Sequence, residues 1–192
     1  MKKIMVRLYV YLKVDGIIDW YYDRMLGIDT KGSYPAPYRQ IKNILQSIPV
    51  VGKNVCDIGC GQGRFLFMAA KQRANSCMGI DFDLDRIRMA KKNLTTSKVN
   101  ADIVFRHANA MEFKHYKGFN VFFLGNPFGI EILDECIKHV KASCQLNPIQ
   151  IIYSYGPNLK GKELMDSQSW LKSKPLFTGC TLYYSLVQSS IA

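Results

Sequence analysis

The stretch from Asp57 to Gly63 combines an acidic residue with three glycines at alternate positions. It follows a short apolar run and precedes a stretch with helical apolar spacing. Glycine lets the backbone approach a ligand at distances where a Cβ atom would collide. A dinucleotide-binding loop has the pattern Gly-x-Gly-x-x-Gly, and Arg64 occupies the position of its third glycine. Asp57 therefore suits a ligand with an ammonium group better than one with phosphates at this place.

A second acidic residue, Asp81, ends the next apolar run. A carboxylate at this position can bind both ribose hydroxyls of a nucleoside. Asp57 and Asp81 together fit a ligand with an amino-acid end and an adenosine end. A nucleotide-dependent oxidoreductase is a competing interpretation, which Arg64 disfavours.

The elements that position these residues alternate between strand and helix patterns. Strands are expected at 54–58, 77–81, 103–106, 121–124 and 150–155. Helices are expected from apolar stripes at 41–48, 64–72, 84–94 and 130–140. The runs 103–106 and 121–124 are continuous and apolar, which is typical of strands covered on both faces.

The end of the chain breaks this alternation. Residues 177–178 and 181–187 have strand patterns joined at Gly179-Cys180, which predicts an antiparallel hairpin. The sequence therefore predicts an α/β protein with a doubly wound, seven-stranded sheet, mostly parallel with a C-terminal antiparallel hairpin. Ligands of such sheets bind at the carboxyl ends of the strands.

From about Asn54 to Val187 the chain resembles the class I S-adenosylmethionine-dependent methyltransferases, which have a Rossmann-like sheet. In that family the Asp-x-Gly-x-Gly-x-Gly loop holds the methionine part of the cofactor, and the acidic residue ending the second strand binds the ribose. The resemblance implies S-adenosyl-L-methionine as cofactor. It implies a cofactor site of Asp57, Gly59, Cys60, Gly61, Gly63, Asp81, Phe82, Asn109, Ala110 and Tyr38. Asn109 stands where the family usually has an acidic residue near the adenine.

The residues Asn126-Pro127-Phe128 follow the fourth expected strand. They resemble the Asn-Pro-Pro-aromatic motif of amino-group methyltransferases, with Phe128 in place of the second proline. The resemblance implies a catalytic role, because an Asn oxygen can accept hydrogen bonds from an amine and Phe128 can offer a ring face to a base or an alkylammonium group. The alternative is a helix start with Asn126 as cap and Pro127 as first helical residue.

Residues 1–50 are expected to form an N-terminal helical and aromatic arm, and residues 51–192 the methyltransferase domain. The stretches 27–32 and 34–39 resemble those of small stand-alone bacterial methyltransferases and, more distantly, seven-stranded protein lysine methyltransferases. In one interpretation Tyr38 or Tyr34 covers the cofactor and Asp29 meets a cationic substrate. In the other, the arm packs against one edge of the sheet.

The chain of 192 residues has 26 Lys and Arg against 15 Asp and Glu, a net charge of +11. This excess favours polyanionic partners or acidic substrates, but the basic residues are spread out and no nucleic-acid-binding module is recognisable. The apolar run from Ile4 to Leu12 is split by Arg7 and ends at Lys13. That pattern argues against a signal peptide and a membrane span.

The six cysteines include no Cys-x-x-Cys pair, so we expect reduced core residues in a cytoplasmic protein. Glu135, Cys136 and His139 could share a helix face, but they lack a second ligand pair at zinc spacing, and no metal site is expected. We expect a methyltransferase acting on a nitrogen of a protein side chain or a small molecule. The alternatives are amino groups of RNA or DNA, and a catalytically silent module that binds the cofactor or a protein partner.

Overall fold

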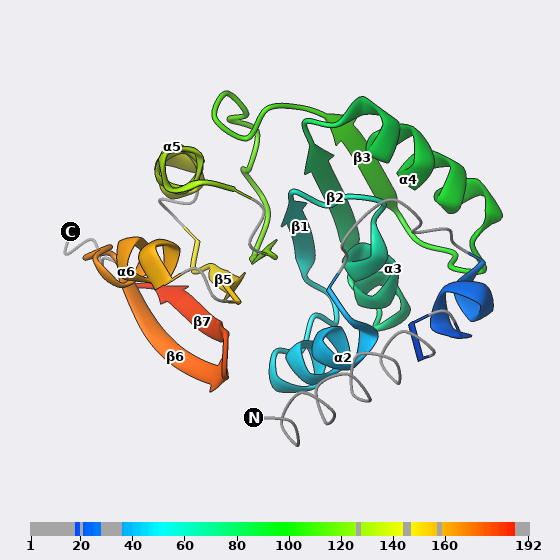
Figure 1. The fold of residues 1–192 in the computed structure, drawn as a ribbon, viewed down its shortest axis with the longest axis horizontal. Helices are drawn as coiled ribbons and strands as arrows, with labels where there is room; N and C mark the ends of the chain where they lie inside the picture. The colour runs from blue at the N-terminus through cyan, green and yellow to red at the C-terminus, as the bar shows by residue number, and fades with distance from the viewer. Residues whose placement is uncertain are drawn as a thin grey trace, which may run out of the picture.

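The structure is a computed structural model that describes residues 18–19, 21–27, 36–125, 128–143, 147–156 and 159–186. Its strands form one seven-stranded sheet in the order β3-β2-β1-β4-β5-β7-β6 (Figure 1). The pairs among β1 to β5 are parallel, whereas β7 pairs antiparallel with both β5 and β6. The predicted fold class is confirmed. The strands are β1 Asn54–Ile58, β2 Ser76–Asp81, β3 Ile103–His107, β4 Val121–Leu124, β5 Gln150–Ser154, β6 Leu171–Phe177 and β7 Cys180–Ser185.

Helices cover both faces of this sheet, as expected for a doubly wound fold. Ile44 of α2, Leu66 of α3 and Ile87 of α4 belong to one buried hydrophobic cluster, and Ile137 of α5 and Met165 of α6 belong to a second. The helices are α2 Tyr38–Ser47, α3 Arg64–Lys71, α4 Leu84–Thr96, α5 Ile130–Ser143 and α6 Leu159–Asp166. Residues 18–19 and 21–26 are also helical and are called the arm helix below.

The two continuous apolar runs have different positions in the sheet. β4 lies between β1 and β5 and is buried along its whole length, as predicted. The prediction that residues 103–106 are covered on both faces is wrong, because β3 is an edge strand with exposed Val104 and Arg106. Apolar composition alone does not distinguish an edge strand with one covered face from a central strand.

The C-terminal hairpin is longer than predicted, and a helix precedes it. β6 begins at Leu171, although its middle residues are exposed and include Pro175. Lysine and proline are typical of edge strands, where they weaken the strand pattern in the sequence. α6 was not predicted, because it buries only Gly161 and Met165 and shows no clear apolar stripe.

Several predictions fall on residues outside the described ranges: those for the run Ile4–Leu12, for Asp29, Tyr34, Asn126 and Pro127, and for the end of the last strand at Val187. Five of the six cysteines are described, and all five are buried and outside any disulfide, as predicted. No helix in the described ranges is long and apolar enough to cross a membrane.

Candidate cofactor site

The glycine loop connects β1 to α3 and is anchored on the neighbouring strand. The backbone N–H groups of Gly59 and Cys60 donate hydrogen bonds to the carbonyl oxygen of Ile80, at 2.8 and 2.9 Å. Gly59, Gly61 and Gly63 have φ angles of 81°, 53° and 90°, which lie in the left-handed region that favours glycine. The alternate glycines are therefore required by the conformation of this loop.

The glycines differ in what surrounds them. A Cβ atom on Gly63 would lie 2.5 Å from the ring of Phe105 on β3, so this glycine allows α3 to pack closely against the sheet. A Cβ atom on Gly61 would meet nothing within 4 Å. Gly61 is thus the loop position with open space beside it, whereas Gly63 serves internal packing.

Two buried carboxylates flank this loop at the carboxyl ends of β1 and β2. The carboxylate of Asp81 accepts hydrogen bonds from the backbone N–H groups of Gly61 at 2.8 Å and of Asp83 at 2.9 Å. Asp57 is buried, and burial raises the pKa of its carboxyl well above the ordinary value, with a further contribution from the nearby charge of Asp81. None of the ion pairs within the described residues includes Asp57. This carboxyl is suited to a cationic ligand that would stabilise its charged form.

A cavity of about 340 Å³ lies beside Asp81, within the usual size of small-molecule sites. It is lined by Gly59, Ile80, Asp81, Phe82, Ala108, Asn109, Ala110, Met111, Phe128, Gly129 and Ile132. The structure therefore brings together six residues that the sequence singled out: Gly59, Asp81, Phe82, Asn109, Ala110 and Phe128. Phe82 is 67% exposed, so its ring is available to a planar ligand.

The far wall of the cavity is a turn that Asn109 stabilises. The Asn109 side-chain oxygen accepts a hydrogen bond from the backbone N–H of Met111 at 3.0 Å, and its amide nitrogen donates to Glu112 at 3.3 Å. A ring nitrogen of His139 on α5 lies 2.8 Å from the Met111 carbonyl oxygen. Side chains of the turn and of α5 thus hold this wall together.

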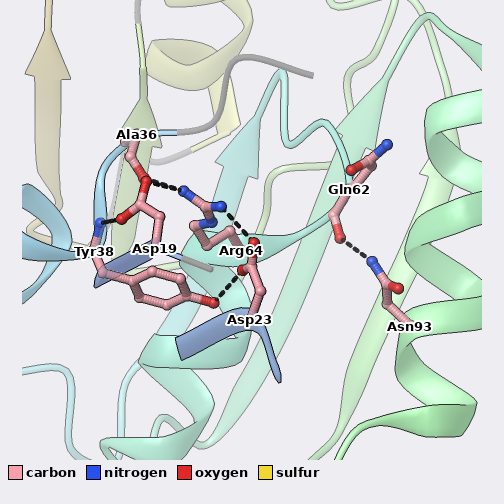
Figure 2. Close-up of polar contacts among 7 residues, drawn as sticks. All are labelled: Asp19, Asp23, Ala36, Tyr38, Gln62, Arg64 and Asn93. Carbon is pink, nitrogen blue, oxygen red and sulfur yellow. Dashed lines mark hydrogen bonds and ion pairs between the residues drawn. The ribbon is translucent and has the colours of Figure 1, made fainter. Parts of the chain in front are cut away.

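Five of the implied cofactor residues do not line the cavity: Asp57, Cys60, Gly61, Gly63 and Tyr38. Gly61 and Gly63 belong to the loop described above, and Cys60 packs against Gly79, where a Cβ atom would lie 2.7 Å from the Cys60 sulfur. Tyr38 is buried against Arg64, whose guanidinium carbon lies 4.6 Å from the centre of the Tyr38 ring. Figure 2 shows Tyr38 and Arg64 with two acidic residues of the arm helix.

Of the Asn126-Pro127-Phe128 motif only Phe128 is described, and it lines the cavity. The described part of α5 begins at Ile130, and the helix-cap alternative for Asn126 and Pro127 falls on residues outside the described ranges. The backbone N–H of Leu133 bonds to the carbonyl oxygen of Gly129, so the first helical hydrogen bond starts after Phe128.

The residues of the weak metal pattern have other contacts. Cys136 is buried next to the Tyr116 hydroxyl, at 3.9 Å, and Glu135 forms an ion pair with Lys138. In the described part of the chain, no group of three His, Cys, Asp or Glu side chains could hold a metal ion.

Comparison with known proteins identifies the family. Residues 49–175 match the family model described as a methyltransferase domain. The chain therefore belongs to this methyltransferase family, within the class I S-adenosylmethionine-dependent superfamily.

The individual relatives are distant. Ribosomal protein L11 methyltransferase of Alkaliphilus metalliredigens is 34% identical over 68 residues, 35% of this chain and 22% of that protein. Norajmaline N-methyltransferase of Rauvolfia serpentina is 25% identical over 137 residues, 68% of this chain and 44% of that protein. The chain thus spans less than half the length of these curated relatives. A solved RNA methyltransferase from Salinibacter ruber, in complex with S-adenosyl-L-homocysteine, superposes with a TM-score of 0.61 at 18% identity, over 83% of this chain and 97% of that one.

Two features that support the loop were not found from the sequence: the glycine at position 79 and the ion pairs of Arg64. Gly79 lies in the middle of β2, where a Cβ atom would collide with Cys60 and Leu66. A glycine inside a strand pattern is a known signal of close approach and could have identified it. The partners of Arg64 are 41 and 45 residues away in the sequence, and no local pattern reports such a contact.

Proposed function

We propose that this chain transfers the methyl group of S-adenosyl-L-methionine to a nitrogen of a protein side chain or a small molecule. The observation that carries the proposal is the pair of buried carboxylates beside the glycine loop, Asp57 on β1 and Asp81 on β2, together with a cavity that Asp81 and the loop residue Gly59 line. Asp57, which has no ion-pair partner among the described residues, matches the ammonium group of this cofactor, and Asp81 at the end of β2 matches its ribose hydroxyls.

The residues present fit the cofactor in chemical type. In this proposal Asp57 holds the ammonium group, Asp81 the ribose hydroxyls, and Phe82, Asn109 and Ala110 the adenine. The space beside Gly61 leaves room for a ligand against the loop backbone. The cofactor supplies a methyl group on a sulfonium centre. The protein then contributes positioning of the acceptor and exclusion of water.

The acceptor site is proposed at Asn126, Pro127 and Phe128, after β4. The Asn126 side-chain oxygen accepts hydrogen bonds from the acceptor amine and so directs its lone pair, while Pro127 removes a competing backbone donor. Phe128 lines the same cavity as Asp81, which supports a place for the acceptor next to the cofactor. The curated relatives include a ribosomal protein methyltransferase and an alkaloid N-methyltransferase, in line with an acceptor nitrogen on a protein or a small molecule.

Nucleic acid is the second candidate acceptor, and the net charge of +11 favours it. The basic residues described on α4, Arg88, Lys91 and Lys92, are exposed, but a solvated helix face has the same pattern.

We also propose the division into an arm of residues 1–50 and a methyltransferase domain of residues 51–192.

A methyl-transfer assay on fractionated lysate tests this function. Lysate separated into protein, nucleic acid and small molecules is incubated with the purified chain and methyl-labelled S-adenosyl-L-methionine. We expect label in the protein or the small-molecule fraction, and none with an Asp57→Asn control. Label in the nucleic-acid fraction alone would favour the second candidate. Cofactor binding without label in any fraction would favour a catalytically silent module.

A further inference from the structure

Four residues connect the arm helix to the start of α3, and we call them the arm clip: Asp19, Asp23, Tyr38 and Arg64. The Arg64 guanidinium donates to the carboxylates of Asp19 at 2.8 Å and of Asp23 at 2.7 Å. The second oxygens of these carboxylates accept from the backbone N–H and the hydroxyl of Tyr38, at 2.9 and 2.7 Å. Each carboxylate is thus shared between the start of α3 and the start of α2 (Figure 2).

The arm clip is shielded from water. The Arg64 side chain is 5% exposed, and those of Asp19 and Asp23 are 19% and 15% exposed. Hydrogen bonds between ionised partners are strong, and shielding reduces their screening by solvent and salt. Burial and the hydrogen bond to Asp23 raise the pKa of the Tyr38 hydroxyl, so this group stays a donor at neutral pH. The clip is therefore a stable contact between the arm helix and the start of α3.

The clip also supplies what the start of α3 lacks. α3 has no side-chain cap and no acidic residue in its first turn, although helix N-termini favour negative charge. Arg64 is the first residue of α3 and would add an unfavourable positive charge there. Asp19 and Asp23 from the arm helix offset that charge. The arm thus compensates for a local defect directly beside Gly63.

The glycine loop is held on its other flank by α4. The side-chain amide of Asn93, which is buried, donates to the carbonyl oxygen of Gln62 at 3.2 Å. Figure 2 shows this contact in the same view as the arm clip. Gly63 lies between Gln62 and Arg64 in the sequence. The second half of the loop is therefore held by α4 through Gln62 and by the arm helix through Arg64.

We propose that Arg64 is a positioning residue for the cofactor, acting through the arm clip. The clip sets the position of residues 61–64, and its loss allows the loop to move away from Asp81, whose carboxylate bonds to Gly61. Arm docking and cofactor binding are then coupled, and each strengthens the other. This inference rests on the proposed function. It assigns Tyr38 a contact with Arg64 in place of a contact with the cofactor.

Titration calorimetry of the full chain with S-adenosyl-L-homocysteine tests the coupling. We expect Arg64→Met to weaken binding about tenfold, within the usual range for linked sites. Tyr38→Phe removes a single hydroxyl, keeps the ring, and should weaken binding about threefold. Arg88→Met is the matched control, because it breaks an exposed ion pair on α4 and should bind as wild type does. If Arg64→Met does not fold, Tyr38→Phe decides.

Proteolysis provides a readout that a purely structural role would not change. In wild type, S-adenosyl-L-homocysteine should slow trypsin cleavage after the exposed Arg24 more than cleavage after Lys172 on the distant β6. In Arg64→Met the two sites should be protected equally. Equal protection in wild type, or wild-type affinity in both folded variants, would overturn the clip's role. A folded wild type that does not bind the ligand would overturn the proposed function as well.

Discussion

The carboxylate of Asp81 accepts a hydrogen bond from the backbone N–H of Gly61 at 2.8 Å. The residue that ends β2 therefore holds the middle of the loop that follows β1. The nearby charge of Asp81 also contributes to the raised pKa of Asp57. One carboxylate thus shapes the loop and favours a neutral form of the other when no cation is present.

The first prediction concerns the stability of the ligand-free protein. The pKa of Asp57 is raised above 3.8, so the folded state binds more protons than the unfolded state between 3.8 and the raised value. Its contribution to stability is therefore complete at low pH and is lost as the pH rises through that window. Asp57→Asn removes the dependence. Within the window, the unfolding free energy of Asp57→Asn minus that of wild type should therefore rise by about 1.4 kcal/mol for each pH unit.

Chemical denaturation of both proteins from acidic to neutral pH measures this difference. The Asp85→Asn variant is the control, because the Asp85 side chain is 85% exposed and lacks the burial that raises the pKa of Asp57. A constant difference between wild type and Asp57→Asn across the range would contradict the prediction.

The second prediction separates two glycines of the loop. Gly63→Ala places a Cβ atom 2.5 Å from Phe105 at a φ of 90°, so we expect a loss of about 2–4 kcal/mol in unfolding free energy. Gly61→Ala has only the left-handed backbone to accommodate and should cost about 1–2 kcal/mol. Its new methyl group enters the open space and should weaken cofactor binding. Equal stability losses in the two variants would show that the contact with Phe105 is unimportant.

The third prediction concerns the cysteines. Burial raises the pKa of the thiols of Cys77, Cys136 and Cys180 to about 12 and that of Cys60 well above its ordinary value. Thiolates are the reactive form, so these side chains should resist thiol reagents at about pH 8 until the protein unfolds. Mass spectrometry of native protein treated with a thiol reagent measures the labelling of each peptide. Rapid labelling of any of these four would contradict their burial.

The central elements could be predicted from the sequence because their apolar residues are continuous and local. β1 and β4 have the predicted bounds, and Asp57, Asp81 and the glycines are placed around one loop. α6 and most of β6 were missed because α6 has few apolar residues and β6 few that are buried. The ion pairs of Arg64 in the arm clip join residues 41 and 45 positions apart, and apolar periodicity does not report such contacts.

The fourth prediction tests the acceptor site. Asn126→Ala removes the proposed acceptor of the amine hydrogen bonds, so methyl transfer should slow by about 100-fold while affinity for S-adenosyl-L-homocysteine stays unchanged. Single-turnover rates on the labelled lysate fraction measure the effect. Asn43→Ala, at an exposed position of α2, is the control and should react as wild type does. Transfer by Asn126→Ala at the wild-type rate would remove this residue from the mechanism.

Calorimetric titration with S-adenosyl-L-methionine tests the central claim most directly. The account predicts saturable binding to wild type, with no comparable binding of NAD. Asp81→Ala loses hydrogen bonds to a charged group, worth about 1.5–3 kcal/mol, and should bind at least about tenfold more weakly. Folded wild-type protein that shows no saturable binding, or Asp81→Ala that binds with wild-type affinity, would contradict the cofactor site described for this chain.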